Sequence, residues 1–171
     1  MSCNSTSRAF SNSPAWGCIV IGVLTCLALA LAAQTAMAPA VVSMRGSGAA
    51  AVKAGGTAEV KLVFAIAPGF HIQSNHPNSP YLIPTTLAIS SASGVSVAAV
   101  RWPQAEQLKL AFSPDPLAVF SGSLPVNLKL RAAANASGTR VLNGTLRYQA
   151  CTATLCRPPA TLPVHLTVHV Q

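Results

Sequence analysis

Regular alternation of apolar and polar side chains constrains this 171-residue chain more than any other feature. Over 57–66, 123–131 and 162–170 nearly every second residue is a large apolar one, and this period of two puts the apolar groups on one face of a β-strand. The side chains expected in the core are Val60, Leu62, Phe64, Val126, Leu128, Val164, Leu166 and Val168, joined by Leu146 from a weaker strand. The parity is decisive, because a slip of one residue would turn each set outward.

Weaker strand patterns occupy the intervals between these runs. They cover 86–90, 95–100 and 140–148, and clusters of Gly, Pro, Asn and Ser separate them. Short strands with turn residues between them, and no convincing helical period after the first forty residues, are typical of a sandwich of antiparallel sheets. The sequence therefore predicts an all-β domain built as an antiparallel β-sandwich.

The N-terminal segment has the features of an export signal. No charged residue occurs between Arg8 and Arg45, and 18–33 lack any strongly polar side chain. Two Ala-x-Ala sites follow, of which the second ends at Ala40, so a secretory signal peptide cleaved after Ala40 is the expected interpretation. An uncleaved membrane anchor is one alternative. A lipoprotein attached through Cys26 is another.

The chain therefore divides into a signal peptide, 1–40, and one exported domain, 41–171, placed in the periplasm or another oxidising compartment. Eleven basic and three acidic residues give a net charge of +8, but the basic residues form no cluster, so no nucleic-acid partner is expected. The scarcity of carboxylates disfavours two-carboxylate hydrolysis. Contact with a membrane is expected only if the signal segment stays uncleaved.

Two cysteines carry most of the chemical information. Three of the five lie in the predicted signal peptide, which leaves Cys151 and Cys156 with four residues between them. A pair in an exported chain indicates a disulfide. Closing so short a loop stabilises a fold by only about 2 kcal/mol. Cys151 ends a predicted strand and Cys156 follows a turn-like stretch, so Cys156 is expected to be the more exposed of the two, and Arg157 is expected to favour its thiolate. From spacing alone, a structural disulfide and a redox-active one both stay open.

The histidines offer further alternatives. His71 could tune the acidity of the cysteines or could be a partly buried strand residue. His71 and His76 could join the two cysteines in a metal site, for instance for copper, but this spacing is a weak signal. We therefore expect no metal and no other cofactor.

Three motifs carry a family resemblance. They are Pro-Gly-Phe-His-Ile-Gln-Ser-Asn at 68–75 with Ile-Pro-Thr at 83–85, Leu-Ala-Val-Phe-Ser-Gly at 117–122, and Tyr-Gln-Ala-Cys…Cys-Arg-Pro-Pro at 148–159. With them the chain resembles the N-terminal periplasmic domain of the DsbD thiol:disulfide interchange proteins, an immunoglobulin-like domain also named a disulfide bond corrector domain.

The resemblance implies an immunoglobulin-like sandwich in which Cys151 and Cys156 form a reversible redox couple. It also implies that Cys156 forms mixed disulfides with partners, that Cys151 resolves them, and that Phe112 caps the pair. The chain departs from the best-known members in having one residue fewer between the cysteines, and in having His71 and Gln73 where those members have tyrosines near the disulfide.

The expected function is thiol:disulfide exchange that relays reducing equivalents to partner proteins, an activity like that of a protein-disulfide reductase. The expected partners are thioredoxin-like periplasmic proteins. A membrane electron donor is expected to act in trans, because the family members continue into a membrane-embedded carrier and this chain ends at Gln171. The alternatives are a non-catalytic immunoglobulin-like binding module with a structural disulfide, and a copper-handling protein.

Overall fold

The computed structural model describes residues 40–46 and 48–171, and in this part of the chain all regular structure is β-strand. The predicted signal peptide lies outside the described residues, except for Ala40 at its end. Among the described residues there is no helix that is long and apolar enough to cross a membrane.

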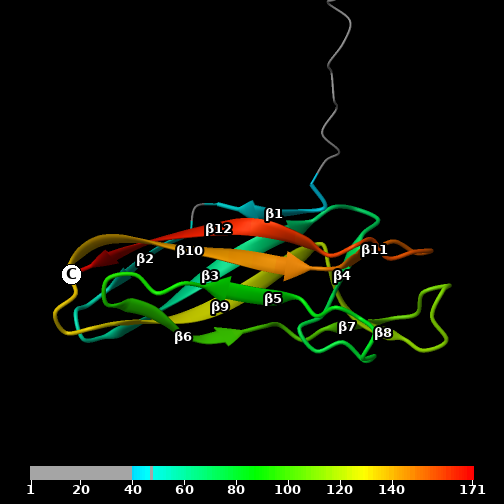
Figure 1. The fold of residues 1–171 in the computed structure, drawn as a ribbon, viewed down its shortest axis with the longest axis horizontal. Coiled ribbons are helices and arrows are strands. Elements are labelled where there is room, and N and C mark those ends of the chain that lie inside the picture. Colours follow the sequence, from blue (N-terminus) through cyan, green and yellow to red (C-terminus); the bar gives the residue numbers. More distant parts are fainter. Residues whose placement is uncertain (1–39, 47) are drawn as a thin grey trace, which may run out of the picture. The chain divides into compact units, whose positions relative to one another are not determined.

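Two four-stranded sheets form the body of the domain (Figure 1). The first has the order β1 (Val42–Arg45), β3 (Thr57–Ile66), β9 (Ser123–Ala132) and β6 (Val95–Arg101). The second has the order β2 (Gly48–Val52), β12 (Ala160–Val170), β10 (Gly138–Tyr148) and β5 (Thr86–Ile89). The strands pair antiparallel throughout, except that the N-terminal β2 joins the edge of the second sheet parallel to β12. The predicted all-β, immunoglobulin-like sandwich is confirmed.

The sandwich core lies between these two sheets, and its composition follows from the alternation in the sequence. All nine side chains predicted to point inward are buried, and Phe64, Leu128 and Leu166 are at most 1% exposed. The register pairs Leu62 with Val126 across β3 and β9, so the apolar faces of the two strands coincide. The expected parity is therefore confirmed.

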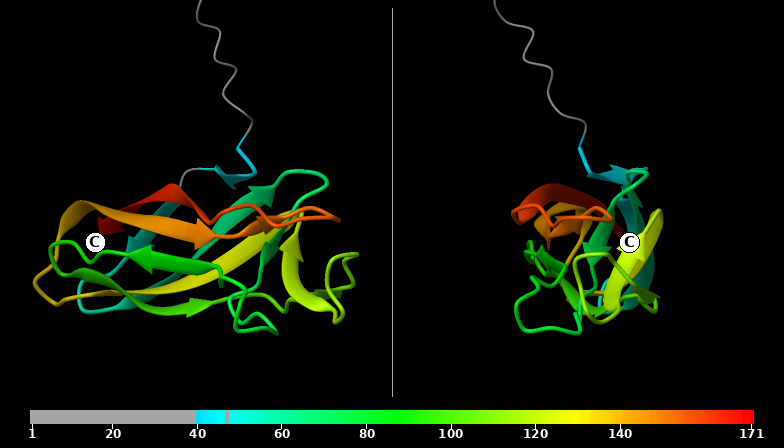
Figure 2. Two further views of the ribbon diagram at one scale, coloured as in Figure 1. Left: turned by 45° about the vertical axis from the view of Figure 1, so that its right-hand side comes forward. Right: turned by 90° about the vertical axis from the view of Figure 1, so that its right-hand side faces the viewer.

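A third, smaller sheet lies at the end of the domain away from the C-terminus (Figure 2). Its order is β11 (Ala150–Cys151), β4 (His71–Gln73), β8 (Leu117–Ser121) and β7 (Glu106–Leu108), all antiparallel. One face of this sheet joins the main core through Ile72, Phe120 and Ala150. Because side chains alternate along a strand, Cys151 lies on the opposite face. The site is thus set apart from the core by the thickness of one sheet.

Candidate redox site

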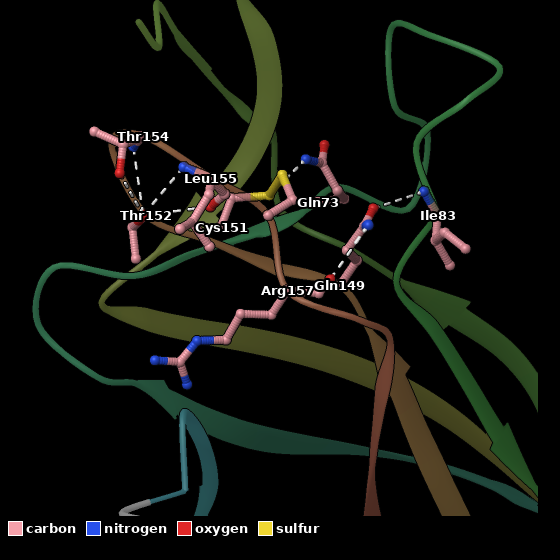
Figure 3. The surroundings of a disulfide bond; sticks show 9 residues. Gln73, Ile83, Gln149, Cys151, Thr152, Thr154, Leu155 and Arg157 are labelled. Atoms are coloured by element: carbon pink, nitrogen blue, oxygen red, sulfur yellow. Dashed lines mark hydrogen bonds between the residues drawn. A yellow bond between two sulfur atoms is a disulfide. The ribbon is translucent and has the colours of Figure 1, made fainter. Parts of the chain in front are cut away.

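Cys151 and Cys156 form a disulfide across a tight hairpin (Figure 3). The backbone N–H of Thr152 donates to the carbonyl oxygen of Leu155 over 2.8 Å. The hydroxyl oxygen of Thr152 accepts the backbone N–H groups of Thr154 and Leu155 over 3.4 and 3.3 Å. These bonds pair several backbone polar groups of the turn locally, so the loop between the cysteines is a closed hairpin.

The two sulfur-bearing residues differ in burial. Cys151 is completely buried and Cys156 is partly exposed, which is the order of exposure that their sequence surroundings predicted. Cys151 belongs to a small apolar cluster that is separate from the main core. Its other members are Leu110, Leu117 and Val119, with Leu82, Leu108 and Cys156 packed against them. An attacking thiolate therefore reaches Cys156 more readily than Cys151.

The side chain of Gln73 contacts the buried sulfur. Its Nε2 donates to the Sγ atom of Cys151 over 3.3 Å, and the residue is completely buried (Figure 3). The backbone of Gln73 is fixed on both sides, because its N–H donates to the carbonyl oxygen of Gln149 over 3.0 Å and its carbonyl accepts the hydroxyl of Thr85. Its Oε1 atom is also buried and has no hydrogen-bond partner.

A second glutamine, Gln149, holds the surrounding segments together. Its Oε1 accepts the backbone N–H of Ile83 over 3.1 Å, and its Nε2 donates to the carbonyl oxygen of Arg157 over 3.4 Å. The backbone N–H of Arg157 in turn donates to the carbonyl oxygen of Ala150 over 2.7 Å. Gln149 therefore connects the loop after β4 to the segment that follows the disulfide, and neither of these side-chain hydrogen bonds involves a sulfur atom.

The positive charge of Arg157 is directed away from the disulfide. Its guanidinium carbon lies 4.4 Å from the centre of the Phe70 ring, and its side chain extends away from the sulfur atoms (Figure 3). A cation is attracted to the face of an aromatic ring, which accounts for this position. The electrostatic support that the sequence suggested for the Cys156 thiolate is therefore not provided by this side-chain conformation.

His71 lies directly opposite Cys151 in the register of β4 and β11. Its Nδ1 is 3.0 Å from the hydroxyl oxygen of Ser121, and that hydroxyl donates to Oε2 of Glu106 over 3.0 Å. Because the single O–H of Ser121 is used toward Glu106, the histidine contact requires a proton on Nδ1. A polar row therefore crosses all four strands of the third sheet, from Cys151 through His71 and Ser121 to Glu106.

No group of three or more potential metal ligands among His, Cys, Asp and Glu exists among the described residues. His76 is exposed on the loop after β4, and both cysteines are engaged in the disulfide. A disulfide sulfur is not a thiolate, which is the form that binds zinc or copper.

Phe112 lies in the segment 109–116, which connects β7 to β8 and reaches over the small cluster with Leu110. The segment is folded on itself, since the backbone N–H of Ser113 donates to the carbonyl oxygen of Leu110 over 3.1 Å and Lys109 donates to the carbonyl of Pro114. The Phe112 side chain is 40% exposed and Leu110 is 4% exposed. The structure thus places Leu110 in the same small cluster as Cys151, and the capping role of Phe112 stays a prediction.

Sequence reasoning located the disulfide but missed most of its surroundings. Leu82, Leu110 and Gln149 lie in loops or at a strand end, where neither alternation nor spacing marks them. Gln73 stands in the first family motif, where it departs from the best-known members, but its contact with Cys151 was not predicted. Its position two residues after His71 was the available signal, because residues two apart on a strand share a face.

The chain belongs to the family described as "Thiol:disulfide interchange protein DsbD, N-terminal", whose model matches residues 43–167. In this chain the domain has a disulfide between Cys151 and Cys156.

Two solved structures are similar in arrangement. The N-terminal periplasmic domain of ScsB from Proteus mirabilis is 15% identical with a TM-score of 0.49, and the match covers 73% of this chain and 44% of that one. The DsbD N-terminal domain of Neisseria meningitidis, in the reduced form, is 18% identical with a TM-score of 0.42, and the match covers 63% of this chain and 75% of that one. The chain thus spans less than half of the ScsB domain. None of the curated proteins compared with it matches significantly.

Proposed function

We propose that this protein is a periplasmic thiol:disulfide exchange domain that relays reducing equivalents to thioredoxin-like partners through Cys151 and Cys156. The observation that carries the proposal is the position of the disulfide: it closes a hairpin outside the main core and has one partly exposed sulfur-bearing residue. So short a loop stabilises the fold by only about 2 kcal/mol. This small stabilisation does not account for the disulfide, whereas thiol:disulfide exchange does.

In the proposed reaction, the Cys156 thiolate of the reduced domain attacks a disulfide of the partner. One partner sulfur leaves as a thiolate and takes a proton from water, and the other is held in a mixed disulfide with Cys156. The Cys151 thiolate then attacks Sγ of Cys156 and releases the second partner sulfur. Two electrons pass to the partner, which leaves as a dithiol, and the Cys151–Cys156 disulfide is restored. A dithiol of a membrane electron donor, acting in trans, reduces it again.

The surface around the third sheet supports docking of a partner at this end. Four large apolar side chains are notably exposed among the described residues, and three of them, Tyr81, Phe112 and Leu155, lie in segments that adjoin the third sheet or the disulfide. Exposed apolar groups close to a reactive centre are typical of an interaction surface. In this proposal the segment 109–116, with Phe112, shields the couple until a partner displaces it, and His71 tunes the acidity of the cysteines.

The proposed location follows from the N-terminal segment. We propose that 1–40 are a signal peptide and that the exported domain begins near Val41. N-terminal sequencing of the protein from its host tests this, and an intact Met1 in the membrane fraction would contradict cleavage.

An electron-transfer assay tests the proposed function. The protein, reduced with dithiothreitol and freed from the reagent, is mixed with an oxidised thioredoxin-like protein, and thiols are labelled and located by mass spectrometry. We expect a partner dithiol to appear as the Cys151–Cys156 disulfide forms, and no transfer from a variant with both cysteines replaced by serine. A wild-type protein that transfers no electrons although it is fully reduced and folded would favour a structural disulfide.

A further inference from the structure

The amide of Gln73 is only half satisfied in the disulfide form. Its Nε2 donates to Sγ of Cys151 over 3.3 Å, whereas its Oε1 is buried without a partner. The orientation is the one that chemistry requires, because a disulfide sulfur carries no proton and can only accept. A buried acceptor without a donor is a cost that folded proteins usually avoid. The unpaired Oε1 therefore calls for an explanation in another state of the site.

Reduction supplies the missing donor. It adds two electrons and two protons to the disulfide, delivered by a partner dithiol or by two molecules of glutathione, and leaves two cysteines. In its protonated form the Cys151 thiol can donate its S–H to Oε1 of Gln73. In its ionised form the thiolate accepts the Nε2 N–H, as a charge-assisted bond. One amide thus pairs with both protonation states of reduced Cys151.

The residues around Cys151 leave the Gln73 amide as its hydrogen-bonding group within the cluster. The other buried residues in the cluster of Cys151 are Leu110, Leu117 and Val119, and their side chains offer no hydrogen-bond donor to a buried thiolate. The backbone of Gln73 is held by Gln149 and Thr85 independently of the sulfur. The amide therefore stays in place when the S–S bond opens, while the freed Cys151 side chain can adjust toward it.

We propose that Gln73 is a catalytic residue of the couple: its amide favours reduced over disulfide-bonded Cys151 and stabilises the Cys151 thiolate that resolves the mixed disulfide. The resolving step rests on the proposed function, whereas the preference for the reduced form needs only a reducible disulfide. Replacing Gln73 by methionine, which has a similar shape, removes the donor and the acceptor together.

The first test equilibrates the full chain with glutathione buffers and measures the reduced fraction of the Cys151–Cys156 peptide by alkylation and mass spectrometry. For Gln73→Met we expect the equilibrium constant for reduction to fall roughly tenfold, which for a two-electron couple is about 30 mV toward a more negative potential. Gln149→Met is the matched control, since it removes a second side-chain amide near the disulfide whose hydrogen bonds go to Ile83 and Arg157 and not to a sulfur atom. It should change the constant less than about twofold.

The second test reads the acidity of Cys151. In a Cys156→Ala background, the rate of Cys151 alkylation is followed against pH at the level of the peptide. Gln73→Met should raise the apparent pKa of Cys151 by about one unit. A merely structural role for Gln73 would lower the stability in denaturant and leave this pKa unchanged.

Should Gln73→Met fail to fold, Gln73→Asn replaces it, because it keeps an amide but withdraws it from the sulfur by one methylene group. It should give the same direction of change in both tests. An unchanged equilibrium constant and an unchanged pKa in a folded variant would overturn the inference and leave the proposed function intact. A wild-type disulfide that glutathione buffers never reduce while the domain stays folded would overturn both.

Discussion

The sandwich body and the third sheet are built on different principles. The long strands of the body have ten or eleven residues, as in β3, β9, β10 and β12, and they alternate between buried and exposed positions. The strands of the third sheet have two to five residues, and β8 is buried at four successive positions. A long alternating strand gives one face to a core and one to water, whereas a short strand buried on both faces joins two cores.

The body therefore provides most of the stability of the domain, and the third sheet carries the disulfide. The body buries Phe64, Leu128 and Leu166 among many other apolar groups and needs no disulfide to do so. The third sheet uses one face to dock on the body and leaves the other for a small cluster around Cys151. The disulfide can therefore open while the sandwich stays folded, and the following predictions test that separation.

The largest effect is expected from the main core. Phe64→Ala removes a completely buried ring and should lower the free energy of unfolding by about 3–5 kcal/mol, measured by urea denaturation. Under native conditions the rate at which glutathione reduces the disulfide should stay the same. A large change in that rate would show that the two regions are not separable.

A smaller loss is expected from removal of the disulfide. Replacing both Cys151 and Cys156 by alanine should cost about 2 kcal/mol through the lost loop constraint, with a further loss from the buried Cys151 side chain. The circular dichroism spectrum should remain that of a β-protein. Unfolding of the whole domain would contradict a sandwich that stands without its disulfide.

The segment over the small cluster should control access rather than stability. Leu110→Ala should speed the reaction of the disulfide with glutathione several-fold, because Leu110 packs in the cluster with Cys151. Phe112→Ala should also speed it if the ring caps the couple, but less, since Phe112 is more exposed. An unchanged rate in Phe112→Ala would remove the capping role, and an unchanged rate in both would mean that the segment does not shield the site.

The smallest effect concerns alkaline pH. Burial raises the pKa of Tyr148, against an opposing backbone hydrogen bond at Val42. The unfolded chain releases the Tyr148 proton near pH 10, whereas the folded chain keeps it to a higher pH. The contribution of this group to the free energy of unfolding is therefore fully present below pH 10 and is lost as the pH rises through the folded pKa. Tyr148→Phe should flatten this loss in thermal melts of the oxidised protein recorded on both sides of pH 10. A loss that is unchanged in Tyr148→Phe would assign it to other groups.

The sequence predicted the strands of the body well, because each long strand has one buried and one solvent-facing side, and this shows as alternation in the sequence. The run 57–66 became β3 with the same bounds, and the weaker patterns became β5, β6 and β10. The short strands were missed. Leu117–Ser121 has no alternation because it is buried on both faces, and His71–Gln73 is too short for a period to show.

At the site, the sequence identified the two cysteines by their position in the exported part, and their order of exposure by the residues that flank them, but it did not identify the residues that contact them in the fold. The contact between Gln73 and Cys151 joins residues 78 positions apart, and it depends on the pairing of β4 with β11. Likewise, the sequence places Arg157 beside Cys156, but only the fold shows that Phe70 attracts its charge. Local pattern thus locates the reactive atoms, and the tertiary structure determines what tunes them.

The most direct test of the account traps the mixed disulfide with a thioredoxin-like partner whose resolving cysteine has been removed. Two variants are compared, Cys151→Ala and Cys156→Ala, each reduced, freed from the reductant and incubated with the partner, whose remaining cysteine has first been converted to a mixed disulfide with thionitrobenzoate. The free thiolate of the variant displaces thionitrobenzoate. The products are analysed by non-reducing electrophoresis and peptide mapping. Cys151→Ala should accumulate a stable mixed disulfide through the partly exposed Cys156, and Cys156→Ala should accumulate little, because Cys151 is completely buried. Equal trapping by both variants would contradict the assigned roles, and no trapping by either would contradict exchange through this couple.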